Sequence, residues 1–215
     1  MKLKCLAGAV AIAVLAFLPS QAAAAPIYSA VSTIGGAPIA NFEGFAEGTI
    51  ISNQYAGVTF GQLDGGTPMI DNSPFLFGYA QSSGAAVLTG SQNGGAPFPT
   101  VAGLTATFAA PQSAVEFFLS DTSPLGDYTL SAYGAGNVLL ESTVLTAAQV
   151  NGGHYVGFTG AGILKVTVDG VVENDAFGID DLRATAGAAV PEPASLLLLG
   201  VGLAGAAARR RRARA

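Results

Sequence analysis

The chain has 215 residues, of which 50% are hydrophobic and only 11% are charged, and its formal net charge is −5. It contains one cysteine and one histidine, which excludes a disulfide-stabilised fold and metal sites built from several histidine or cysteine ligands. Seven of its nine basic residues lie near the two ends, at positions 2, 4 and 209–214. The region between them is strongly acidic, which argues against nucleic-acid binding.

The first 24 residues have the pattern of a secretory signal peptide. Lys2 and Lys4 precede an apolar run that extends from Cys5 to Leu18, and small residues follow it. Cleavage after Ala24 leaves alanine at both positions where signal peptidase requires a small side chain. We therefore expect signal peptidase to remove residues 1–24 on export, and the one cysteine with them.

Residues 25–183 are predicted to form one all-β domain. Short runs that alternate apolar and polar residues are separated by clusters of glycine, asparagine, proline and aspartate, which is typical of half-buried antiparallel strands. The expected strands cover residues 38–43, 57–63, 75–79, 85–89, 101–109, 114–120, 127–133, 137–145, 155–159 and 164–168. Their number and spacing predict a two-sheet antiparallel sandwich of jelly-roll type.

A further expected strand, at residues 176–182, has an irregular hydrophobic pattern. Phe177 and Ile179 share one face of an extended strand, whereas Leu182 has the opposite parity. One face can hold all three side chains only if an extra residue is inserted between them. We therefore predict a β-bulge near Asp180, which would also redirect a carboxylate.

Acidic residues dominate the predicted domain. Between residues 25 and 189 there are thirteen acidic residues and two basic ones, Lys165 and Arg183, which gives a net charge of −11. Five of the carboxylates lie between Asp169 and Asp181. Such a domain repels nucleic acid and anionic membranes and suits divalent cations. A plain solvated acidic surface is the alternative interpretation.

Three segments of the domain resemble the opening and closing strands of exported jelly-roll domains, which are similar to carbohydrate-binding modules and galactose-binding-like domains. They are Asn41-Phe-Glu-Gly-Phe45, the run from Gly48 to Phe60, and Ala176-Phe-Gly-Ile-Asp-Asp-Leu182. The resemblance implies a structural Ca²⁺ between the first and last strands, with Glu43 and either Asp180 or Asp181 as ligands. The alternative is that the two aspartates end a strand and one of them pairs with Arg183.

The sequence offers little support for an enzyme. His154 is the one histidine, it lies in a predicted turn, and no G-x-S-x-G motif accompanies it. We expect no catalytic residues. The domain also lacks tryptophan, so a sugar-stacking face would depend on tyrosine and phenylalanine. The candidates, each of which could equally belong to the core, are Tyr55, Phe75, Phe77, Tyr79, Phe98, Tyr133 and Tyr155.

The last part of the chain combines three features in a fixed order. After a short linker at residues 184–189, the motif Val190-Pro191-Glu192-Pro193 precedes an uncharged apolar run at 194–208. As a helix this run spans roughly 22 Å, which is short for a permanent anchor. A basic cluster follows it, formed by Arg209, Arg210, Arg211, Arg212 and Arg214.

This arrangement resembles the PEP-CTERM sorting signal of Gram-negative bacteria, so residues 190–215 are assigned to it. The resemblance implies recognition of Pro191, Glu192 and Pro193 by an exosortase-type membrane transpeptidase. It also implies a membrane helix at 194–208 that the basic cluster at 209–214 holds with its end in the cytoplasm. The expected path runs from an inner-membrane intermediate facing the periplasm to the cell surface or extracellular matrix.

Taken together, these patterns predict an exported protein with a structural or adhesive role in exopolysaccharide or biofilm, where its partner is a polysaccharide or surface glycan. Calcium would fix the sandwich or bridge it to acidic polymer. A calcium-dependent, lectin-like carbohydrate-binding module is the second interpretation. A glycan-active hydrolase, whose two carboxylates would have to meet across a cleft, is the third.

Overall fold

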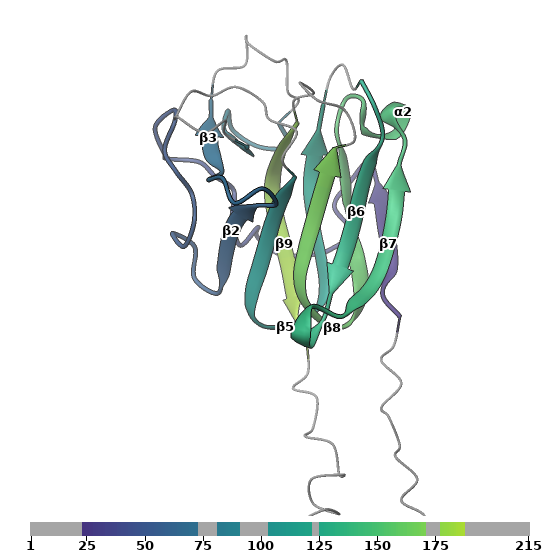
Figure 1. Ribbon diagram of the computed structural model, residues 1–215. Coiled ribbons are helices and arrows are strands. Elements are labelled where there is room, and N and C mark those ends of the chain that lie inside the picture. Colours follow the sequence, from purple (N-terminus) through teal and green to yellow (C-terminus); the bar gives the residue numbers. More distant parts are fainter. Residues whose placement is uncertain (1–22, 73–80, 91–102, 122–124, 171–176, 188–215) are drawn as a thin grey trace, which may run out of the picture. The chain divides into compact units, whose positions relative to one another are not determined.

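The computed structural model of the protein describes residues 23–72, 81–90, 103–121, 125–170 and 177–187 (Figure 1). All of them belong to one compact unit, Gln21–Val190. Strands make up most of the described residues: β1 (Ala25–Ser29), β2 (Val58–Gln62), β3 (Met69–Asp71), β4 (Val87–Thr89), β5 (Leu104–Ser120), β6 (Tyr128–Tyr133), β7 (Leu139–Leu145), β8 (His154–Gly170) and β9 (Gly178–Ala186). A 3₁₀ turn, η1 (Ala135–Asn137), and a one-turn helix, α2 (Ala147–Val150), complete them.

The strands form two antiparallel layers, which are joined because β5 and β8 run through both. The front sheet consists of β2, the first half of β5, the second half of β8, β6 and β7 (Figure 1). The back sheet consists of β3, β4, β9, the second half of β5, the first half of β8 and β1. The register of β5 and β8 shifts between Thr107 and Gln112, where the two strands pass from one sheet to the other.

The core lies between the two sheets. A small cavity there is lined by Leu104 and Val166 from the front sheet and by Phe117 and Ile179 from the back sheet, among others. The expected alternation holds along β5, where Leu104 and Ala106 are buried and Thr107 is exposed. The prediction of an all-β antiparallel sandwich is confirmed.

The alternation fails at one predicted position. Leu164 has the same parity in the strand as the buried Val166 and Val168, but it is only half-buried, and Ile163 is fully buried instead. The reason is the register shift: Lys165 pairs with Thr107, whereas Ile163 pairs with Gln112. β5 contains extra residues at this shift, and the inward and outward positions along β8 are exchanged there.

Several predicted strands are confirmed and others need correction. Residues 57–63, 85–89, 127–133 and 137–145 contain β2, β4, β6 and β7. The predicted strands 101–109 and 114–120 are parts of one long strand, β5. In the same way, 155–159 and 164–168 are both parts of β8. The segment 38–43 forms no strand, only a bridge between Ala40 and Leu182. The predicted strand 75–79 lies outside the described residues.

The folded domain extends beyond its predicted boundary at residue 183, whereas its first strand begins at the predicted boundary at residue 25. The predicted linker at 184–189 begins too early, because residues 184–186 belong to β9 and pair with β5. At the other end, β1 starts directly after the predicted cleavage site and pairs with β8. The apolar segment 194–208 lies outside the described residues, among which no helix is long and apolar enough to cross a membrane.

Candidate functional site

The predicted bulge is present in β9. Glu116 of β5 pairs with Arg183 and Phe118 pairs with Asp180, so two steps on β5 correspond to three on β9. Asp181 has a φ of 46°, a left-handed conformation that aspartate tolerates better than most residues. Because of this insertion, Phe177, Ile179 and Leu182 all reach the core. The two aspartates at the bulge are themselves buried.

Asp180 is held by the segment that precedes β4, residues 81–86, which we call the serine loop. Its Oδ2 accepts hydrogen bonds from the Ser82 N–H at 3.1 Å, the Ser82 hydroxyl at 2.9 Å and the Ser83 N–H at 3.0 Å. Its Oδ1 accepts the N–H of Asp181 at 2.7 Å. Both carboxylate oxygens therefore have N–H donors directed at them.

Asp181 meets the same loop from the next position. Its carboxylate accepts hydrogen bonds from the hydroxyls of Ser82 at 2.8 Å, Ser83 at 3.0 Å and Tyr155 at 3.3 Å. It also lies 3.8 Å from Nη2 of Arg183. The predicted pairing of one aspartate with Arg183 is thus present for Asp181, but the two aspartates lie within β9 and do not end a strand.

Glu43 binds the other end of the serine loop. Its Oε1 accepts the N–H groups of Ala85 and Ala86, each at 3.0 Å. Gly84 makes this approach possible, because a Cβ at that position would lie 2.1 Å from the Glu43 carboxyl carbon. The chain before Glu43 also pairs with β9, through the N–H of Leu182 and the carbonyl of Ala40 at 2.8 Å. The structure therefore brings all three predicted carboxylates to one loop.

Burial changes the acid–base behaviour of this site. It raises the pKa of Asp180 to about 6, against the opposing effect of the hydrogen bonds from Ser83 and Ser82. Burial also raises the pKa of Tyr55, whose hydroxyl accepts the N–H of Phe42 at 2.8 Å. The charges of Asp180 and Glu43 both add to that rise. Negative charge in this region is therefore poorly solvated.

In this arrangement the three predicted calcium ligands accept hydrogen bonds from the serine loop. Calcium takes six to eight oxygen ligands, whereas the carboxylates here face N–H and O–H donors, whose hydrogens repel a cation. Among the described residues no group of three or more acidic, histidine or cysteine side chains is placed to hold a metal ion. Calcium binding by Glu43, Asp180 and Asp181 stays a prediction from the sequence.

A fourth carboxylate, which the sequence analysis did not single out, is bound in the same manner. Glu116 is fully buried and accepts the N–H groups of Thr33 at 3.0 Å and Ile34 at 3.1 Å, together with the hydroxyls of Ser32 and Thr33. Strand alternation places Glu116 on the outer face of the back sheet, where solvent is expected. Residues 32–34 cover that face, and no local pattern in the strand indicates that they do.

The histidine and the aromatic candidates are placed mostly in packing roles. The ring of His154 stacks on Tyr28, with centroids 4.8 Å apart. Tyr155 is buried, and Tyr55 packs against Phe42 and Phe60 beside the core. Tyr133 is half-exposed. Phe75, Phe77, Tyr79 and Phe98 lie outside the described residues.

Comparisons with solved structures give only remote similarities. The K2 cleaved adhesin domain of Lys-gingipain is 16% identical, with a TM-score of 0.45, over 76% of this chain and 99% of that one. The enzymatically active domain of bacteriophage CBA120 tailspike protein 4 is 14% identical, with a TM-score of 0.35, over 63% of this chain and 20% of that one. At these scores neither similarity carries an argument about function. No curated protein matches the chain in sequence.

One comparison bears directly on the fate of the protein. Residues 189–212 match the PEP-CTERM protein-sorting motif. The match contains Pro191, Glu192 and Pro193 as well as Arg209 to Arg212, all of which lie outside the described residues. Processing by an exosortase is what this motif implies. The chain thus carries a PEP-CTERM protein-sorting motif, which supports an exported protein that is sorted to the cell surface.

Proposed function

We propose that this protein has a structural or adhesive role in the exopolysaccharide or biofilm that surrounds the cell. The observation that carries the proposal is the sorting motif at 189–212, which follows a compact β-sandwich in the same chain. A surface-sorting signal directs the sandwich to the place where polysaccharide is found. The chain contributes to that material either as a building part or as a link to it.

The use of the buried carboxylates supports a role without catalysis. Glu43, Glu116, Asp180 and Asp181 each accept hydrogen bonds from backbone or serine, threonine and tyrosine groups of neighbouring segments. Groups engaged in this way hold loops in position instead of presenting a base or nucleophile to a substrate. We therefore propose that the protein is not an enzyme.

The steps of sorting belong to the same proposal. Signal peptidase removes residues 1–24, and an exosortase-type transpeptidase acts at Pro191 to Pro193. Before that step the segment 194–208 holds the protein in the inner membrane with the sandwich in the periplasm. The final location is the cell surface or matrix.

A calcium-dependent, lectin-like module of jelly-roll type is the second candidate. The meeting of Glu43, Asp180 and Asp181 at the serine loop favours it. For a cation to bind there, the N–H groups of Ser82 and Ser83 must first move away from Asp180. Sugar binding would then change with calcium, whereas the structural role requires no such change.

The test uses residues 25–189, which lie within the compact unit Gln21–Val190. This fragment is mixed with exopolysaccharide from the producing strain, in calcium and separately in chelator, and is sedimented. Equal retention in both conditions without released sugar supports the structural or adhesive role. Retention in calcium alone supports the lectin-like module. Released oligosaccharide contradicts both candidates, and absence of retention contradicts a polysaccharide partner.

A further inference from the structure

The outer face of the front sheet carries a continuous row of accessible side chains. Successive residues of the row pair directly across neighbouring strands, so their side chains project from the same face. The row consists of Thr59, Thr107, Lys165, Tyr133 and Leu139, one residue from each strand of the front sheet. All five are exposed or half-exposed. At the usual spacing between strands the row is about 19 Å long.

A second row lies beside the first. It consists of Gly61, Thr105, Thr167, Ser131 and Ser142, again in direct register across the sheet. Thr167 and Ser131 are buried in this row, but Ser142 is exposed and its hydroxyl lies 2.9 Å from that of Ser131. Hydroxyl groups, which both donate and accept hydrogen bonds, therefore predominate on this face.

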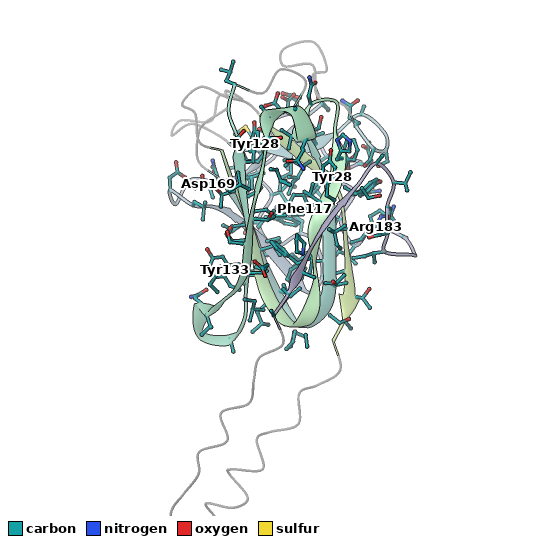
Figure 2. The ribbon with its side chains drawn as sticks, turned by 90° about the vertical axis from the view of Figure 1, so that its right-hand side faces the viewer. Tyr28, Phe117, Tyr128, Tyr133, Asp169 and Arg183 are labelled. Carbon is teal, nitrogen blue, oxygen red and sulfur yellow. The ribbon has the colours of Figure 1, made fainter. Side chains whose placement is uncertain are left out.

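Tyr133 is held in place within the first row by its neighbour Lys165. The ammonium group of Lys165 lies 4.4 Å from the centre of the Tyr133 ring and donates a hydrogen bond to Oδ1 of Asn137 at 2.7 Å. Figure 2 shows Tyr133 and Asp169 on one side of the sandwich, Tyr28 and Arg183 on the other, and Phe117 between them. An aromatic ring held in one orientation needs little ordering when it contacts a ligand.

The charge of the molecule restricts what can bind to this face. The sequence between residues 25 and 189 has a net charge of −11, so a polyanion is repelled from the domain as a whole. The two rows contain one charged residue, Lys165, and its charge is already engaged with Tyr133 and Asn137. Exposed Asp169, which pairs with Thr129 beside the second row, adds a negative charge to the same face, so a long polymer without charge avoids the repulsion that this residue and the rest of the domain exert.

We propose that the outer face of the front sheet is a docking surface for a neutral polysaccharide. The chain lies across the strands along the first row, with the C–H face of a sugar ring against Tyr133 and its hydroxyl groups on the threonines. This inference rests on the proposed role in exopolysaccharide and specifies the class of polymer and the face that holds it.

The test measures binding of the 25–189 fragment to a neutral glucan by affinity electrophoresis, with alginate as the acidic probe. Tyr133→Ala removes the ring, and Thr107→Glu places a negative charge within the row. Tyr28→Ala is the matched control, since Tyr28 is an exposed tyrosine of the back sheet. We expect each front-sheet variant to lose about tenfold in affinity and the control to bind like the unmodified fragment. Binding to the glucan should change little with salt.

Each other outcome overturns the proposal in a recognisable way. If the front-sheet variants bind the glucan as well as the unmodified fragment does, the face is wrong while the polysaccharide role survives. If the fragment binds alginate or the producer's exopolysaccharide but no neutral glucan, the polymer class is wrong. Binding to none of them contradicts the proposed function as well. A dimer in sedimentation velocity that Thr107→Glu dissociates makes the face an interface between copies. Melting curves confirm that each variant is folded.

Discussion

Single carboxylates decide how the outer side of the back sheet is built. A buried carboxylate is strongly destabilising unless hydrogen bonds compensate for its lost hydration. Glu116 meets this requirement with two backbone N–H groups and two hydroxyls, and Asp180 with three N–H groups and one hydroxyl. Apart from the Asp181 N–H, all of these donors come from a distant segment of the chain. The carboxylates therefore fasten loops to the sheet.

Replacement of Glu116 tests this role directly. In Glu116→Ala the N–H groups of Thr33 and Ile34 lose their acceptor in a buried place, so we expect a loss of about 2–4 kcal/mol in the free energy of unfolding. Glu141→Ala is the control, because Glu141 is half-exposed on β7 and should cost less than about 0.5 kcal/mol. Urea denaturation measures both. Equal losses in the two variants would show that residues 32–34 do not depend on Glu116.

The buried state of Asp180 predicts a pH dependence of stability. Its pKa is about 6 in the folded protein, above the ordinary value of 3.8 that we assume for the unfolded chain. Below pH 6 the folded state therefore binds more protons at Asp180 than the unfolded state does, and acidification stabilises the fold through this group. Between about pH 7 and pH 5 the gain is about 1–2 kcal/mol.

The measurement compares urea denaturation at both pH values, in chelator, for the unmodified domain and Asp180→Asn. Other carboxylates titrate in both proteins, so their contributions cancel in the comparison. The unmodified domain should gain more stability, or lose less, on acidification than the variant does. Identical pH dependence in the two proteins would mean that Asp180 titrates normally. If the variant does not fold, carboxyl NMR of the unmodified domain gives the pKa of Asp180 directly.

At the scale of elements, the sequence predicts what depends on local alternation and fails where pairing is irregular. The strands β2, β4, β6 and β7 follow from period-two patterns, and the bulge at Asp180 follows from the parity of three apolar residues. By contrast, β5 and β8 were each divided in two, because the register shift between Thr107 and Gln112 interrupts the alternation without ending the strand. A helix start was also overlooked: Thr146 and Gln149 have capping-box spacing, and Oε1 of Gln149 accepts the Thr146 N–H at 2.8 Å.

The candidate site also has a part that the sequence predicts and a part that it does not. Its acidic residues were recognisable from their motifs, but their partners were not. Ser82 and Ser83 lie almost a hundred residues from Asp180 in the sequence. Only the folding of the chain brings them together, and a pair of serines in a glycine-rich stretch has no distinctive pattern. The burial of Glu116 could not be predicted, because strand alternation alone assigns this residue to solvent, whereas tertiary contacts cover it.

The serine loop depends on a glycine at its turn. Gly84 has a φ of 50°, and a Cβ there would displace the carboxyl group of Glu43. In Gly84→Ala we expect backbone strain of about 1 kcal/mol and a further loss of about 1–2 kcal/mol, because Ala85 and Ala86 lose their acceptor. Gly48→Ala is the matched control: its φ is 74°, but a Cβ would meet nothing within 4 Å. If Gly84→Ala and Gly48→Ala lower the melting temperature equally, Glu43 moves aside without a loss of stability.

At the scale of the whole molecule, the two outer faces of the sandwich differ in kind. The back sheet carries buried carboxylates covered by the serine loop and by residues 32–34, while the front sheet presents open rows of hydroxyl groups. Several acidic residues of the sequence are thus buried inside the fold. This separation assigns stability to one face and leaves the other available for a polymer.

The difference between the faces leads to a prediction about calcium. The sequence predicts that calcium fixes the sandwich, whereas in the structure the serine loop already supplies hydrogen-bond donors to Asp180, Asp181 and Glu43. A cation would have to displace those donors, and the free energy of losing them offsets the gain from binding. We therefore expect residues 25–189 to melt at the same temperature in millimolar calcium and in chelator, and Ser82→Ala to lower that temperature in both. A melting temperature that rises with calcium concentration in the unmodified domain would show that the loop withdraws and that a cation takes its place.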